Sequence, residues 1–301
     1  MSSRIIALPK ILDDRGNLSF LENGHQIPFE IKRVHWIFDV PGGEVRGNVA
    51  YKQSEEFIVA LSGSFDVWVD NGKQVEKYHL NRSYEGVYVP RGTWRKIDNF
   101  STNSLAVIAT STLYDEQDAI RDYDEFVAWA NHLPNLPNAV DKSDFSEVGL
   151  RIQSPREIPA FTVDDCEIIR LDRHHSARKG DICVVENTRT LPFDIKRLYY
   201  LYDVPADALR GGHAHKNLYQ LLVAASGSFR VTLDDGQTKK SIYLNRPYQA
   251  LLIKPGIWRE VDDFSSGSVC LVLASECYDE SDYIRNYQDF LQSKTMQPSF
   301  K

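Results

Sequence analysis

This sequence contains two histidines separated by a single residue, a spacing that could bring both side chains to one reaction site. They are His213 and His215, in the stretch RGGHAHK at 210–216. Alternate residues of a β-strand point to the same face, so both imidazoles would share one face while Ala214 points to the other. Such a pair can bind a metal ion, transfer protons, or hydrogen-bond within a core.

The residues around the pair disfavour a metal site. Metal-binding cupins, whose histidine spacing this resembles, add a glutamate shortly afterwards and a further histidine late in the barrel. Here Tyr219 and Gln220 stand at the glutamate position, and Arg259 lies beside the late one. Catalytic zinc or iron needs a third protein ligand, so we predict no metal site. Since histidine titrates near pH 6.5, we predict acid–base catalysis by His213 and His215.

The strand that carries the pair belongs to a repeat. Residues 28–126 and 192–290 align without a gap at a constant offset of 164, with 41 of 99 positions identical. A self-match at a fixed offset indicates two copies of one domain. The first copy has Val49 and Tyr51 where the second has its histidines. We therefore expect one catalytically competent copy and one altered, non-catalytic copy.

Short runs of Val, Ile, Phe, Tyr and Leu, broken by turn signals, predict strands almost throughout. Asn71-Gly72 and Asp235-Gly236 predict hairpins with two-residue turns. An apolar stripe at the end of each copy predicts a short helix. The stripes comprise Ile120, Tyr123, Phe126, Val127 and Ala130 in the first copy, and Ile284, Tyr287, Phe290 and Leu291 in the second.

The fold predicted from this pattern is all-β, with two tandem jelly-roll or barrel domains, each followed by its helix. We place the first domain at 1–131, a Pro-containing linker at 132–150, and the second domain at 151–301. The formal net charge of −7 gives no reason to expect nucleic-acid binding. No apolar run reaches the length of a membrane span, and the first ten residues carry no signal-like stretch. Four cysteines, all in the second half, have no CxxC spacing, which favours a reduced, cytoplasmic setting.

The second copy resembles the nucleotide-sugar 3,4-ketoisomerases, small proteins of the cupin superfamily that act on dTDP-4-keto-6-deoxyglucose. The resemblance rests on IKRLYYLYD, RGGHAHK, SGSFRVTLDDG, IWREVDDFSSGSVCLVLAS and YDESDYIRNY. It covers about 130 residues from Ile168 onward. In the first copy the frame is kept but the histidines are missing.

The resemblance implies an isomerisation without cofactor, in deoxysugar and surface-glycan biosynthesis. A base removes the proton at C3, an enediol forms, and reprotonation at C4 leaves the ketone at C3. This needs proton carriers and donors that stabilise the enolate charge. The catalytic candidates are His213, His215 and Tyr200. The candidates for substrate binding are Arg210, Lys216, Arg230 and Arg259.

Members of this family with one domain form dimers, so the two copies could form an equivalent pair within one chain, with or without a further homodimer. Two other functions stay open from the sequence. One is a non-catalytic protein that binds a nucleotide sugar or acts as a scaffold. The other is a cupin 3,5-epimerase, a reaction that pairs histidine with aspartate and tyrosine; no such residues stand beside His213 in the sequence.

Overall fold

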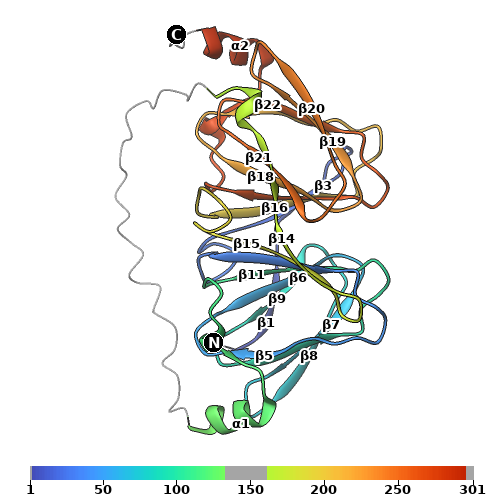
Figure 1. Cartoon of the computed structure of the whole chain (residues 1–301), viewed down its shortest axis with the longest axis vertical. Coiled ribbons are helices and arrows are strands. Elements are labelled where there is room, and N and C mark those ends of the chain that lie inside the picture. The colour runs from blue at the N-terminus through green and yellow to red at the C-terminus, as the bar shows by residue number, and fades with distance from the viewer. Residues whose placement is uncertain (1, 133–160, 296–301) are drawn as a thin grey trace.

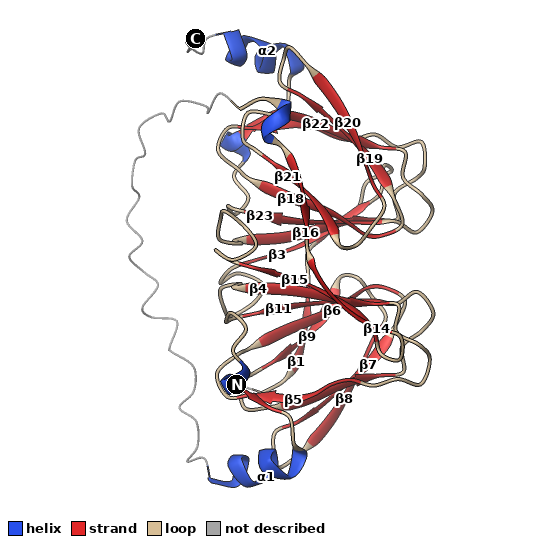
Figure 2. Cartoon of the chain, in the orientation of Figure 1, coloured by secondary structure: helices blue, strands red, loops and turns tan. Residues whose placement is uncertain are grey.

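The computed structural model describes residues 2–132 and 161–295, which form two β-barrels lying end to end along the long axis of the molecule (Figure 1). Each barrel combines a seven-stranded and a five-stranded antiparallel sheet. The seven-stranded sheets lie in the middle of the molecule, and the five-stranded sheets lie toward its two ends (Figure 2). The prediction of two repeated all-β domains is confirmed.

The first barrel contains most of the strands of the N-terminal half. Its seven-stranded sheet has the order β1 (Arg4–Ala7), β9 (Glu85–Val89), β6 (Glu56–Ser62), β11 (Leu105–Thr110), β4 (Arg33–Phe38), β15 (Gly180–Glu186) and β14 (Asp172–Ser176). Its five-stranded sheet has the order β12 (Ala119–Ile120), β5 (Arg46–Tyr51), β10 (Trp94–Asp98), β7 (Phe65–Asp70) and β8 (Val75–Leu80).

The second barrel repeats this arrangement. Its seven-stranded sheet has the order β13 (Glu167–Arg170), β21 (Gln249–Ile253), β18 (Gln220–Ser226), β23 (Val269–Ala274), β16 (Arg197–Tyr202), β3 (Asn17–Glu22) and β2 (Lys10–Ile11). Its five-stranded sheet has the order β20 (Lys239–Leu244), β19 (Phe229–Asp234), β22 (Trp258–Asp262), β17 (Arg210–His215) and β24 (Tyr283–Ile284).

The two barrels exchange strands. The N-terminal strand β3 pairs with β16 of the second barrel, and β15, from the other half of the chain, pairs with β4 of the first. Strands β2 and β14 then add to the outer edges of these exchanged strands. Each half of the chain thus donates a hairpin to the sheet of the other half. The domain limits predicted from the repeat assign each half to its own domain and do not include this exchange.

The packing follows the sheets. Apolar side chains from both seven-stranded sheets form one continuous core between the barrels, with Trp36 from the first and Tyr200 from the second among its largest members. Each barrel also has its own interior core. The shared core removes a large apolar surface from water, which is the main favourable term in such packing.

A helix closes the outer end of each barrel, as predicted. Helix α1 (Tyr123–His132) packs Phe126 against Trp94, and α2 (Tyr287–Thr295) packs Phe290 against Trp258. Three short 3₁₀ turns, η1 (Glu116–Asp118), η3 (Val163–Asp165) and η4 (Glu280–Asp282), complete the described elements.

Two details of the sequence prediction are wrong. Ile120 and Ile284 lie on the two-residue strands β12 and β24 that precede the helices, although both side chains pack against those helices. The hairpin loops hold four residues rather than two, because the pairing of Asp70 with Val75 leaves 71–74 outside the ladder. The Asn71 side chain accepts hydrogen bonds from the backbone of this loop, which stabilises the longer turn. Most of the predicted linker at 132–150 lies outside the described residues.

Candidate functional site

Strand β17 places both histidines on the inner face of the second barrel. Ala214, between them, faces outward and packs with Trp258 and Phe290 under α2. The strand carries a bulge between Gly211 and His213. Gly211 has a φ of +82°, and a Cβ atom there would lie 2.8 Å from the carbonyl oxygen of Arg259. Glycine is therefore required at this bend, which aims His213 into the barrel.

The two imidazoles form a compact group with a tyrosine. Their ring centroids are 5.0 Å apart, and the ring of Tyr283 lies 4.9 Å from His213 and 4.3 Å from His215. Tyr283 stands directly opposite His215 in the pairing of β17 with β24. Two imidazoles and a phenol thus face one small region of the barrel interior.

Asp282 holds His215 from behind. Its Oδ2 lies 2.9 Å from Nδ1 of His215, while its Oδ1 accepts hydrogen bonds from the backbone and side-chain amides of Asn217. Because a carboxylate only accepts, Nδ1 carries the imidazole proton and Nε2 keeps its lone pair. Nε2 of His215 is buried with no partner among the described residues. It is a proton acceptor facing the interior.

A chain of hydrogen bonds crosses the barrel beneath the histidines. Arg259 donates to the carbonyl of His213 at 3.0 Å and to the side-chain oxygen of Gln220 at 2.6 Å. Gln220 in turn donates to the hydroxyl of Tyr199 at 2.8 Å. Strands β22, β18 and β16 supply these three side chains, so the group joins both sheets of the barrel.

Burial and positive charge determine how the histidines titrate. Burial, followed by the charge of Arg259, lowers the pKa of both His213 and His215 well below the ordinary value. Both imidazoles are therefore neutral near pH 7, so each keeps one nitrogen lone pair free of a proton. Burial also raises the pKa of Tyr199 to about 12, so its phenol stays protonated.

The structure separates Tyr200 from the histidines, contrary to the prediction for that residue. Successive strand residues face opposite sides, so Tyr199 points into the barrel and Tyr200 into the core between the barrels. The Tyr200 hydroxyl donates to the carbonyl of Ser83 in the first half of the chain. Tyr199, and not Tyr200, lies in the barrel interior, where its hydroxyl accepts a hydrogen bond from Gln220.

The four predicted substrate-binding residues lie in three different settings. Arg259 belongs to the histidine group. By this name we mean the residues around the imidazole pair: His213, His215, Tyr283, Asp282, Arg259, Gln220 and Tyr199. Arg210 is half-buried where the N-terminal segment crosses the barrel, with its guanidinium 3.3 Å from the carbonyl of Gly16 and 3.5 Å from Asp13. Two others are not brought to the histidines: Lys216 donates outside the barrel to the carbonyl of Ser281, and exposed Arg230 pairs with Asp262.

Sequence reasoning missed several members of this group: Tyr199, Gln220, Asp282 and Tyr283. Only the fold brings the last two, on η4 and β24, beside β17. One signal was present in the repeat: the residue is Tyr283 in the copy that has the histidine pair and Ala119 in the other copy.

The first barrel keeps the frame of this site but changes most of its chemistry. Val49 and Ala119 replace two of the three rings, and Tyr51 replaces the third. Arg95, the counterpart of Arg259, donates two hydrogen bonds of 2.7 and 2.8 Å to the carboxylate of Glu56. Its positive charge is thereby neutralised within the barrel.

No cluster of three or more His, Cys, Asp or Glu side chains is placed to hold a metal ion within 2–132 and 161–295. The predicted absence of a metal stays a prediction. No helix of the described chain is long and apolar enough to span a membrane.

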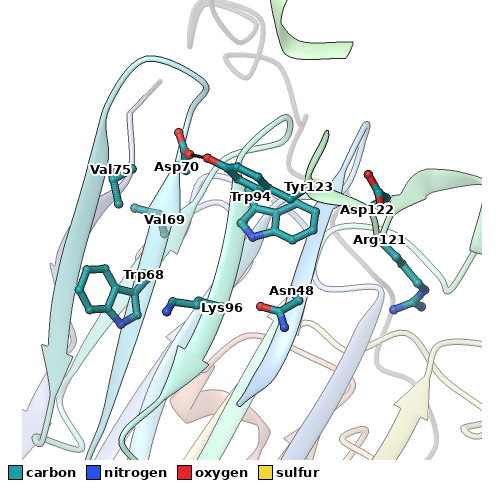
Figure 3. A pocket seen from close by; sticks show the side chains of 10 residues that line it. All are labelled: Asn48, Trp68, Val69, Asp70, Val75, Trp94, Lys96, Arg121, Asp122 and Tyr123. Carbon is teal, nitrogen blue, oxygen red and sulfur yellow. Dashed lines mark hydrogen bonds between the residues drawn. The ribbon is translucent and has the colours of Figure 1, made fainter. Parts of the chain in front are cut away.

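A hollow of about 540 Å³ lies outside the first barrel, beside α1 (Figure 3). The indole of Trp68 lies between the ammonium groups of Lys77 and Lys96, at 5.0 and 4.9 Å from the ring centroid. Lys77 also pairs with Asp66, and Lys96 with Asp98. This hollow shares no residue with the histidine group, and the Trp68 ring in its lining is already in contact with two of the chain's own cations.

Comparison with known proteins identifies the family of the chain. A family model described as "FdtA: WxcM-like, C-terminal" matches twice, over residues 1–131 and 164–295. The chain belongs to the FdtA family. Both copies are recognised as members, including the one without the histidine pair, which confirms the resemblance noted from the sequence.

The relatives of this FdtA-family chain include isomerases. A TDP-4-oxo-6-deoxy-alpha-D-glucose-3,4-oxoisomerase from Aneurinibacillus thermoaerophilus is 47% identical over 112 residues, which cover 37% of this chain and 81% of that protein. The prediction of an isomerase is confirmed at this level.

Two solved structures are also similar. A 3,4-ketoisomerase from Helicobacter canadensis is 45% identical, with 44% of this chain and 98% of that chain covered and a TM-score of 0.43. A variant of the 3,4-ketoisomerase QdtA from Thermoanaerobacterium thermosaccharolyticum, solved with TDP-4-keto-6-deoxyglucose, is 41% identical, with 44% and 95% covered and a TM-score of 0.42.

Proposed function

We propose that the second barrel is a sugar 3,4-ketoisomerase that converts dTDP-4-keto-6-deoxyglucose into the corresponding 3-keto sugar. The observation that carries the proposal is the pair of neutral, buried imidazoles beside Tyr283, in a family whose curated relative acts on this class of substrate. Acid–base chemistry alone accomplishes this reaction, because the substrate and product differ only in the positions of two protons and the double bonds.

The first step is removal of the proton at C3, which is acidic because it lies next to the C4 ketone. Electrons of the broken C–H bond form the C3–C4 double bond, and O4 takes a proton to give the enediol. Loss of the O3 proton and protonation at C4 then leave the ketone at C3. His213 and His215 divide these transfers, and the bare Nε2 of His215 accepts a proton.

One phenol and two guanidinium groups are the further candidates for this chemistry. Tyr283 lies against both imidazoles and is the nearest hydroxyl donor for a substrate oxygen. Arg259, buried beneath His213, carries positive charge toward the enediolate as it forms. Arg210, half-buried where the N-terminal segment crosses the barrel, is the candidate for the diphosphate.

We assign the first barrel a structural role, as the partner that completes the second. Its N-terminal segment supplies β2 and β3 to the second barrel and places Asp13 beside Arg210. The shared core supports the proposal that the two copies are an intramolecular counterpart of a dimer. With Val49 and Tyr51 in place of His213 and His215, the first barrel lacks the two proton carriers proposed for the second.

The function is tested by incubating the protein with dTDP-4-keto-6-deoxyglucose in deuterated buffer and following the sugar by NMR. A ketoisomerase produces 3-keto signals with deuterium at C4. A 3,5-epimerase places deuterium at C3 and C5 and keeps the ketone at C4. This alternative is included in the test because His215 contacts Asp282, and epimerases of this type pair histidine with aspartate. A sugar-nucleotide binding protein incorporates none. The variants His213→Asn and His215→Asn should each lower kcat by about 100-fold or more.

A further inference from the structure

The two copies each have a buried arginine at equivalent positions, but the residue that accepts its hydrogen bond is charged in one copy and neutral in the other. In the first barrel Arg95 faces the carboxylate of Glu56, which is itself fully buried. In the second, Arg259 meets the neutral amide of Gln220 at the equivalent position, 2.6 Å away. Among the described residues no carboxylate lies within ion-pair distance of Arg259. Equivalent positions therefore hold a neutral pair in one barrel and an unbalanced cation in the other.

A second arginine adds to this charge. Arg197 is buried over the rings of Tyr199 and Tyr278, 5.2 and 5.6 Å from their centroids. Its Nε has no hydrogen-bond partner, and in the part of the chain that the structure describes it forms no ion pair. The corresponding Arg33 of the first barrel donates instead to Thr110.

We propose that Gln220 is the positioning residue that keeps the charge of Arg259 available to the reaction. Replacement of Gln220 by glutamate is then sufficient to inactivate the site. This inference rests on the proposed function. It assigns the inactivity of the first barrel to two separate changes, the loss of its histidines and the neutralisation of its arginine by Glu56.

The amide suits this position for a physical reason. A buried guanidinium needs hydrogen-bond acceptors, and the oxygen of Gln220 supplies one without a charge. The freed charge then acts twice in a medium of low dielectric constant. It adds to the effect of burial in keeping the imidazoles of His213 and His215 neutral, and it attracts the negative charge that develops on the substrate oxygens. A carboxylate would hold Arg259 equally well and cancel both effects.

The test compares Gln220→Glu with Gln220→Met and with a control, Gln249→Glu. The control also puts a glutamate where the first copy has one, at Glu85, but outside the histidine group. We expect Gln220→Glu to lower kcat by about 100-fold or more, the range for losing one electrostatic donor. Gln220→Met, which removes the amide but adds no charge, should lose about tenfold or less, and Gln249→Glu should match the wild type.

A second measurement follows the charge without turnover. The imidazole signals of His213 and His215 are titrated by NMR in each folded variant. The local charged groups in this titration are Arg259, Arg197, Arg285 and Asp282, and only the residue at 220 differs. Gln220→Glu should raise the pKa of both histidines toward the ordinary value, and Gln220→Met should not.

The outcomes are distinct. Turnover of Gln220→Glu within about threefold of the wild type overturns the inference, as does an equal loss in Gln220→Met, which would show that the amide acts only by its packing. Unmoved histidine pKa values in Gln220→Glu also overturn it. A wild-type protein that leaves the 4-keto sugar nucleotide unchanged refutes the proposed function instead, while the NMR titration still decides whether the charge of Arg259 is free.

Discussion

Replacing Asp282 by asparagine should move the imidazole proton of His215 from Nδ1 to Nε2. Oδ1 of Asp282 accepts two hydrogen bonds from Asn217, at 2.8 and 3.1 Å, while Oδ2 faces Nδ1 of His215. In Asp282→Asn the two donors of Asn217 keep the amide oxygen on their side. The new NH₂ group then points at Nδ1, which must become the acceptor. The imidazole proton moves to Nε2, and the acceptor that faces the substrate is lost.

The magnitude follows from what is removed. A positioned acid–base group contributes about 10²- to 10⁴-fold to the rate, so kcat of Asp282→Asn should fall within that range. This equals about 2.7 to 5.4 kcal/mol in the activation barrier. KM should change less, since the amide nearly matches the carboxylate in shape and size.

The assay combines turnover of the 4-keto sugar nucleotide with ¹⁵N NMR of the histidine rings, which reports the protonated nitrogen. The matched control is Asp118→Asn in the first barrel. Asp118 is the counterpart of Asp282, but it binds the backbone and hydroxyl of Ser54. It should affect thermal stability and leave kcat unchanged. Activity of Asp282→Asn within about threefold of the wild type, or an Nδ1–H tautomer in that variant, would refute the role given to Asp282.

Three further predictions concern the whole protein. Burial lowers the pKa of His35, His213 and His215, so the unfolded chain binds protons that the folded one does not. The free energy of unfolding should therefore decrease as the pH falls below about 6.5, by at most about 1.4 kcal/mol per pH unit for each histidine. Thermal melts of the wild type and of the His213→Asn/His215→Asn double variant test this, and an equal pH slope in both would contradict it. Exhaustive chelation should leave turnover intact; loss on EDTA treatment, restored by one divalent ion, would establish a metal enzyme. The fragment 161–301, expressed alone, should form a homodimer by exchanging 172–186 or should aggregate, whereas a soluble, fully active monomer in light scattering would show that the first copy is dispensable.

The repeat and the alternation of strand residues were enough to predict the barrels, their helices and the inward aim of both histidines. Alternation could not decide between Tyr199 and Tyr200, because the two neighbours are both tyrosines in a strand that is apolar on both faces. The face of such a strand depends on its register with the opposite sheet. Asp282 and Tyr283 escaped detection because β24 is only two residues long and pairs with a strand far away in the sequence.

The aligned copies already show that Gln220 corresponds to Glu56, but the alignment alone does not indicate what this difference does. Its importance depends on knowing that Arg259 and Arg95 reach those positions from another strand. Arg230 illustrates the reverse case. It differs between the copies as the histidines do, yet it lies on the outer face, paired with Asp262. Divergence between copies therefore identifies candidates, and only the fold separates a site from a surface.

The strand exchange dictates when the protein can fold during its synthesis. Strand β3 is made early but pairs with β16, and β4 of the first barrel must wait for β15. At about 5–20 residues per second, the ribosome needs on the order of ten seconds or more to supply each partner. During that interval β4 is an open sheet edge, beside an apolar face that has nothing to cover it. The nascent chain is thus exposed to aggregation for most of its translation, and neither barrel can become native before nearly two thirds of the polypeptide has been made.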